Sequence, residues 1–236
     1  MPGESKTSVL LLPGMDGTGV LFADLVAELP SNWKVTVAQY PSDKFLNYEQ
    51  LLTQVQTILP HGHVLLVAES FSTPLAVRLA ASLSEHVTGI VLAAGFVANP
   101  LGRRASIAKV MARPAAFRAT PPLWVLKKFL VGGSASRELV QRVRDAIRRV
   151  SPDVLAQRAS AVLSCDERTS LEQTRMPLLY LQAKHDRLVG NECFEVIRKG
   201  RPDAQLEVID APHLVLQCAP RESAEAIVRF ANSQRG

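Results

Sequence analysis

The sequence predicts an α/β fold, in which a mostly parallel sheet of about six strands carries helices on both faces and a helical insertion. Three observations support this fold class. Six short apolar runs alternate with segments of helical periodicity, a pattern typical of parallel sheets. Polar or glycine-rich turns follow four of these runs, as in sheets that bind ligands beyond the carboxyl ends of their strands. About 80 residues between the fourth and fifth runs contain helix signals but no obvious strand.

The six expected strands are short and rich in Val, Leu and Ile. They lie near 7–12, 34–39, 63–69, 87–94, 177–183 and 205–210. Strands of this composition are typical of a sheet that is covered on both faces. With 236 residues and 47% hydrophobic content, the chain can bury a sizeable core.

The third run leads directly into Ser70, and a helical pattern follows it. A sharp turn from strand to helix exposes a nucleophile, and it requires small residues two positions before and after because the backbone crowds there. Ala68 and Ser72 meet that requirement, and Pro74 falls in the first helical turn, where a missing N–H costs little. Free N–H groups at this helix N-terminus favour an anion beside Ser70. Ser70 is therefore the candidate nucleophile.

Two later loops supply the groups that a serine nucleophile needs. His213 follows the run at 205–210 and is the candidate base, while Asp186 follows the run at 177–183 and is the candidate that orients the imidazole. Each residue alone would be read as a loop histidine or a turn-capping aspartate. Three such residues at the ends of three strands, in the order Ser, Asp, His, indicate a catalytic triad. Asp210 is the rival acid, because it lies three residues before His213.

A glycine-rich loop follows the first expected strand and reads Pro13-Gly14-Met15-Asp16-Gly17-Thr18-Gly19. It lacks the Gly-Lys-Ser/Thr ending and the Gly-x-Gly-x-x-Gly spacing of nucleotide-binding loops. Glycines also let the backbone approach a reacting carbonyl group. The N–H groups of Met15 and Phe71 are therefore the expected oxyanion hole.

Taken together, these segments resemble the α/β-hydrolase superfamily, over essentially the whole chain outside its middle third. The matching segments are 12–17 for the oxyanion loop, 68–72 for the nucleophile elbow, 185–189 for the acid loop and 211–214 for the base loop. The chain departs from the common pattern in two places: the oxyanion loop has Leu12-Pro13 where many members carry His-Gly, and the elbow lacks both glycines. The resemblance implies the α/β-hydrolase fold. The chain also resembles small carboxylesterases with an inserted cap, including the pimeloyl-carrier methyl ester esterase type.

The resemblance divides the chain into a hydrolase core, residues 1–97 and 169–236, and a helical cap or lid, residues 98–168. Within the cap, Ser136 and Ser151 are the expected starts of two helices. An apolar run at 123–130 can belong to the core or line an acyl pocket. Trp124 and Phe129, both in this run, are candidate substrate contacts.

Charge is concentrated in the expected cap, which has 14 Lys and Arg against 5 Asp and Glu, a balance of +9. The remaining residues have 13 against 17, so the cap accounts for the net charge of +5. Arg144 and Arg148 lie one helical turn apart and are candidate contacts for an anionic substrate or an acidic acyl carrier protein. A solvated face is the simpler interpretation. No nucleic-acid-binding motif accompanies the charge and aromatic residues are only 6%, so a nucleic-acid partner is not expected.

Other features of the sequence point away from membranes and cofactors. No run approaches 18 apolar residues and the first residues lack the apolar segment of a signal peptide, so we expect a cytoplasmic protein without a membrane span. Three widely spaced cysteines fit neither a disulfide framework nor a zinc pattern. We expect no metal and no organic cofactor.

The constellation predicts a serine hydrolase with a Ser-His-Asp triad and an acyl-enzyme, and the resemblance implies a carboxylesterase that cleaves a small-molecule ester. An acyltransferase or a thioesterase would use the same triad, and so would an esterase for acyl chains on a carrier protein; these alternatives remain open. A non-catalytic ligand-binding protein is disfavoured, because all four chemical positions are filled.

Overall fold

The computed structural model describes residues 7–102, 114–119 and 121–234. Its centre is a six-stranded sheet with the order β2-β1-β3-β4-β5-β6, in which every neighbouring pair is parallel. The strands are β1 (Ser8–Leu12), β2 (Lys34–Val37), β3 (Val64–Glu69), β4 (Val87–Ala93), β5 (Leu178–Ala183) and β6 (Gln205–Ile209). All six predicted strands are confirmed, and the sheet is wholly rather than mostly parallel.

Helices fill the connections between the strands. They are η1 (Val20–Phe22), α1 (Ala23–Glu28), α2 (Tyr48–Gln56), η2 (Ser70–Ser72), α3 (Thr73–Ser82), α5 (Pro114–Phe117), α6 (Leu123–Leu126), η4 (Lys127–Val131), α7 (Arg137–Arg148), α8 (Pro152–Leu163), α9 (Arg168–Gln173), α10 (Glu192–Gly200), α11 (Val215–Cys218) and α12 (Pro220–Ser233). None of the helices in the described ranges is long and apolar enough to cross a membrane.

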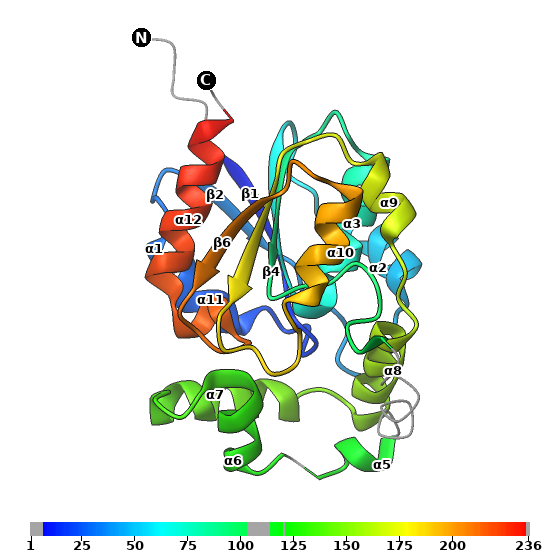
Figure 1. Cartoon of the computed structure of the whole chain (residues 1–236). Coiled ribbons are helices and arrows are strands. Elements are labelled where there is room, and N and C mark those ends of the chain that lie inside the picture. The colour runs from blue at the N-terminus through cyan, green and yellow to red at the C-terminus, as the bar shows by residue number, and fades with distance from the viewer. Residues whose placement is uncertain (1–6, 103–113, 120, 235–236) are drawn as a thin grey trace.

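The sheet is buried on both faces. Helices α1 and α12 cover one face, and α2, α3, α9 and α10 cover the other (Figure 1). Successive residues of β1 alternate between the two layers, with Val9 and Leu11 in one apolar cluster and Leu10 and Leu12 in the other. The predicted arrangement of helices on both faces is confirmed.

Three of the helices between β4 and β5, α5, α6 and α7, form a third layer. We call residues 98–168 the inserted segment. Figure 1 shows α5, α6 and α7 beyond the arrowheads of the strands, so this part of the chain lies over the carboxyl ends of the sheet. Ser136 and Ser151 accept hydrogen bonds from the first turns of α7 and α8, which confirms both predicted helix starts.

The inserted segment shares its apolar contacts with the core. Val140 and Val143 of α7 lie in one apolar cluster with Leu21 and Leu214. Leu21 lies between β1 and β2, and Leu214 follows β6. Arg142 of α7 also forms a two-pronged ion pair with Asp24 of α1, and this contact lowers the pKa of the Asp24 carboxyl. The inserted segment therefore packs on the core at several points, while its role as a cap stays a prediction.

Candidate active site

Ser70 lies at the sharp turn between β3 and α3, where one 3₁₀ turn (η2) intervenes. Its φ angle is +45°, a left-handed conformation that a residue with a side chain adopts only under constraint. The residues on either side are packed: Ala68 and Ser72 have no exposed surface. The Ser72 hydroxyl donates to the Pro13 carbonyl and lies 2.7 Å from the Tyr40 hydroxyl. The elbow is thus clamped to the loop that follows β1.

The three predicted triad residues form one chain of hydrogen bonds. Ser70 Oγ lies 3.0 Å from His213 Nε2, and His213 Nδ1 lies 2.7 Å from Asp186 Oδ2. The side chains of His213 and Asp186 are only 5% and 4% exposed. The Nδ1–H donates to the carboxylate, so Nε2 is left to accept the proton of the serine hydroxyl.

The carboxylate of Asp186 is held from its other side as well. Asp186 Oδ1 accepts the backbone N–H groups of Leu188 and Val189, at 2.8 and 3.0 Å. The rival acid, Asp210, lies elsewhere: its carboxylate is 72% exposed and contacts His185 at 2.7 Å and Lys184 at 3.4 Å. The structure therefore brings Asp186, and not Asp210, to the imidazole of His213.

The loop at 13–17 is fixed by hydrogen bonds at almost every backbone group. Gly14 lies against the carboxyl group of Glu69, and Gly14 O accepts the N–H of Gly17 at 3.0 Å. Gly17 O accepts from Tyr40 N at 2.8 Å. Among the described residues, the Met15 N–H has no hydrogen-bond acceptor. A free, fixed donor of this kind is what an oxyanion hole requires, so the expectation for Met15 stands as a prediction.

Phe71, the second expected donor, is also held firmly. Its ring stacks on Tyr48 at a centroid separation of 5.1 Å, and its carbonyl accepts the Tyr48 hydroxyl at 2.9 Å. Thr73 Oγ1 contacts the Ser70 carbonyl at 2.8 Å in the same turn. The backbone after β3 thus has little freedom to move.

Two buried carboxyl groups lie behind the site. Glu69, the residue before the nucleophile, is 1% exposed, and burial raises its pKa to about 8, with a further contribution from the charge of Asp16. Burial also raises the pKa of Asp16, although hydrogen bonds from Thr18 oppose that effect. Gln217 donates to Glu69 Oε2 at 3.2 Å, while Glu69 Oε1 has no partner among the described residues. Neither group was predicted from the sequence.

Arg158 was also missed. It belongs to α8 of the inserted segment, yet it is 1% exposed and hydrogen-bonds to backbone carbonyls of the loop at 13–17. The signal in the sequence was its position: Arg158 follows the buried residues Val154 and Leu155 by four and three positions, so it lies on the apolar face of its helix.

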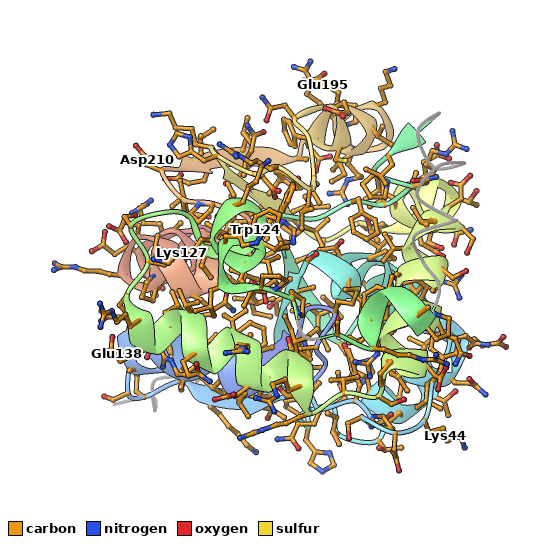
Figure 2. The ribbon with its side chains drawn as sticks, turned by 90° about the horizontal axis from the view of Figure 1, so that it is seen from below. Lys44, Trp124, Lys127, Glu138, Glu195 and Asp210 are labelled. Carbon is orange, nitrogen blue, oxygen red and sulfur yellow. The ribbon has the colours of Figure 1, made fainter. Side chains whose placement is uncertain are left out.

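The candidate substrate contacts in the inserted segment are more exposed. Figure 2 looks onto this layer from outside, with Trp124 near the middle of the view and Lys127 and Asp210 to one side of it. Trp124 is 65% exposed, Phe129 is half-buried, and Arg148 is exposed. Arg144 is half-buried and its Nε has no partner among the described residues. No hydrogen bond or ion pair joins these four side chains to Ser70, His213 or Asp186 in the described structure, and their roles stay predictions.

Within the residues that the structure describes, no group of three or more His, Cys, Asp or Glu side chains could hold a metal ion. Cys165, Cys193 and Cys218 are free thiols, and burial raises the pKa of each to about 12.

The chain resembles known proteins in its sequence and in its fold. No family model matches the sequence. The chain is 28% identical over 226 residues to the biotin biosynthesis bifunctional protein BioHC of Cellvibrio japonicus strain Ueda107. This match covers 92% of the chain and 44% of that protein, so the chain spans less than half the length of its relative.

Solved structures give the same fold. A hydrolase from Oleispira antarctica superposes with a TM-score of 0.82 at 19% identity, over 97% of this chain and 92% of that chain. A thermophilic esterase from Thermogutta terrifontis superposes with a TM-score of 0.83 at 19% identity, over 98% of this chain and 91% of that one. Together with the sheet topology, these likenesses show that the chain has the α/β-hydrolase fold.

Proposed function

We propose that this chain is a serine hydrolase that cleaves carboxylic esters through an acyl-enzyme. The observation that carries the proposal is the hydrogen-bonded chain from Ser70 Oγ through His213 to Asp186, with separations of 3.0 and 2.7 Å. A hydroxyl, a base and an orienting carboxylate in contact are the parts needed to activate a serine.

The first half-reaction forms the acyl-enzyme. His213 Nε2 takes the Ser70 proton as Oγ attacks the ester carbonyl carbon, and the carbonyl oxygen becomes an oxyanion bound by the N–H groups of Met15 and Phe71. The tetrahedral intermediate then collapses: the bond to the alkoxy oxygen breaks, and that oxygen takes the proton from His213. The alcohol leaves, and the acyl group stays on Ser70.

The second half-reaction releases the acid. His213 removes a proton from a water molecule, whose oxygen attacks the acyl carbon, and a second oxyanion forms at the same two N–H groups. Collapse of this intermediate breaks the bond to Ser70 Oγ, which takes the proton back from His213. Asp186 stabilises the imidazolium form of His213 in both halves and keeps its proton at Nδ1.

The inserted segment would act as the cap of this enzyme. Its helices α5, α6 and α7 lie over the carboxyl ends of the strands (Figure 1). Ser70 and His213 follow the carboxyl ends of β3 and β6. Trp124 and Phe129 would contact the acyl part of the substrate, since large apolar side chains on a cap favour a hydrocarbon chain.

An ester on an acidic carrier protein is the second candidate substrate. Two observations favour it: the relative from Cellvibrio japonicus is named for biotin biosynthesis, and the inserted segment is strongly basic. The structure adds a hollow of about 620 Å³ beside the acid and base loops, lined by Lys127, Lys128 and Arg187 among others. These cations, with Arg144 and Arg148, would attract an anionic partner.

A series of p-nitrophenyl esters of increasing chain length tests the proposal. The wild type should hydrolyse part of the series, whereas a folded Ser70→Ala variant should fall to near background. Thioesters of the same chains, and added alcohols with product analysis, distinguish a thioesterase or an acyltransferase from an esterase. Undiminished hydrolysis by Ser70→Ala would exclude Ser70 as the nucleophile.

A further inference from the structure

We infer that Arg158 positions the oxyanion loop at residues 13–17, and with it the Met15 N–H, and that it also packs on the ring of Phe71, which carries the second N–H of the oxyanion hole. Arg158 is a positioning residue, since its contacts are with the loop and not with the reacting atoms. The inference rests on the proposed esterase function, whereas the contacts that support it do not depend on that function.

The guanidinium group bridges two loops that follow neighbouring strands. Arg158 Nη1 donates to the carbonyls of Met15 and Asp16, both at 2.9 Å, and Nη2 donates to the carbonyl of Pro41 at 2.8 Å. Planar guanidinium presents several donors in a fixed geometry, so one side chain can hold three carbonyls in a set arrangement. An ammonium group cannot reproduce this arrangement.

The same group contacts the second oxyanion residue. The Arg158 guanidinium carbon lies 5.8 Å from the centre of the Phe71 ring and 5.7 Å from that of the Tyr40 ring. Both separations are within the range of a cation–π contact. Arg158 therefore touches Met15 at its carbonyl and Phe71 at its ring, the two residues whose N–H groups form the proposed hole.

Burial of the Arg158 charge is energetically unfavourable, so the side chain is expected to have a specific role. Arg158 is 1% exposed, and no carboxylate among the described residues lies within ion-pair distance of it. Its Nε also lacks a partner in the described structure. Burial lowers the pKa of Arg158, and the charge of Asp16 opposes this effect without an ion-pair contact. A buried charge without a paired carboxylate is unfavourable, and an apolar side chain would avoid this cost. What the guanidinium adds is a set of donors for loop carbonyls.

The Arg158 guanidinium packs directly against the backbone at Gly17. A Cβ atom at this position would lie 2.6 Å from Arg158 Nη1, which is closer than such contacts allow, and the φ angle of Gly17 is +69°. Glycine is thus required both for the turn and for the approach of the guanidinium. With Gly17 N–H bonded to Gly14 O, the Met15 N–H between them has a fixed direction.

Arg158→Met tests the inference, because it removes the donors and retains most of the apolar volume. We expect kcat on a p-nitrophenyl ester to fall on the order of 10²-fold with KM within about threefold, as for loss of an oxyanion donor. The inhibition constant of a trifluoromethyl ketone, whose hemiketal oxygen occupies the hole, should rise by a similar factor. Arg158→Lys should show the same pattern, and the exposed Arg149→Met should show none of it.

A second readout does not need activity. Hydrogen exchange of the amides of Gly14 and Gly17 should speed up in Arg158→Met and in Arg158→Lys, and should stay unchanged in Arg149→Met.

Chemical rescue gives a third readout, which uses activity. Added guanidinium ion, but not ammonium, should restore part of the activity of Arg158→Ala.

The outcomes separate the two proposals. If the wild type hydrolyses no ester, the proposed function fails, and exchange of the loop amides still decides whether Arg158 holds the loop. Unchanged exchange and unchanged kcat in a folded Arg158→Met variant would overturn the inference. The inference would also be overturned if the activity lost in Arg158→Met equalled the unfolded fraction of the protein, while the ratio of the ketone inhibition constant to KM stayed that of the wild type.

Discussion

Asp186 Oδ2 lies 2.7 Å from His213 Nδ1, and both side chains are almost completely buried. Two backbone N–H groups hold the other oxygen of Asp186, so the carboxylate can turn neither toward water nor toward another partner. The imidazole is thereby fixed in the tautomer that leaves Nε2 free for Ser70.

Asp186→Asn should lower kcat on the order of 10²–10⁴-fold, because an amide at this position no longer selects that tautomer. KM should change little. Steady-state hydrolysis of the best ester in the series measures both values.

Asp210→Asn is the matched control. Asp210 is exposed and pairs with His185 and Lys184 at the surface, so its loss should change kcat less than about threefold. If Asp210→Asn proves the more damaging substitution, the assignment of the acid is wrong.

The backbone at Ser70 predicts an unusual order of stability. Both Ser70→Gly and Ser70→Ala remove the hydroxyl, but glycine accommodates a φ of +45° without steric cost. Ser70→Gly should therefore be more stable than Ser70→Ala by about 1 kcal/mol in urea unfolding.

Ser160, exposed on α8, gives the comparison with the opposite sign. In a helix interior, glycine is less stable than alanine by about 1 kcal/mol. Finding alanine the more stable replacement at both positions would refute the argument from backbone strain.

Glu69 makes stability depend on pH. Its pKa of about 8 in the folded protein lies above its ordinary value of 4.5, so between these values the folded state binds a proton that the unfolded state releases. The free energy of unfolding should therefore fall as pH rises from about 4.5 to about 8.

Glu69→Gln should remove most of that fall and raise stability at pH 8 by on the order of 1–3 kcal/mol. Urea unfolding at several pH values measures the slope. Glu222→Gln, a change at an exposed carboxylate, should leave the slope as it is. A wild type whose stability is flat from pH 5 to 8 would mean that Glu69 is ionised throughout.

The basic inserted segment predicts a substrate effect that depends on charge. Arg144→Glu with Arg148→Glu should raise KM for a carrier-linked or anionic ester and hardly change turnover of a small neutral ester. Each exposed contact is worth only about 0–1 kcal/mol, so the two changes should act together and weaken as salt increases.

Lys34→Glu with Lys199→Glu alters the net charge equally. Both lysines are exposed, and Lys34 begins β2 at the opposite end of the sheet. This pair should not change KM for either ester. An equal effect of both double variants would mean that net charge, and not a docking surface, governs the interaction.

The sheet could be predicted from the sequence because each strand is a short apolar run with a turn at its end. The same regularity located Ser70, Asp186 and His213, since each follows a strand and the carboxyl ends of parallel strands meet. These predictions needed only local patterns and the rule of parallel sheets.

Glu69 and Arg158 could not be found in this way. Sequence reasoning treats charged side chains as exposed, and only tertiary packing shows which ones are enclosed. Glu69 ends an apolar strand and Arg158 lies on the apolar face of α8, which are weak signals without the partners that explain them. The contacts of Arg158 join positions more than 100 apart in the chain, a relation that no local pattern contains.

Because Arg158 of the inserted segment holds loops of the core, the inserted segment cannot be exchanged independently of the core. Segments inserted between strands of a sheet are natural units to exchange when a new specificity is wanted. Here such an exchange would remove the Arg158 donors from three carbonyls of the core, of which that of Asp16 is buried and those of Met15 and Pro41 are partly buried. A chimera would have to keep an arginine at this position, with glycine opposite it at residue 17, for the recipient core to retain its own loop geometry.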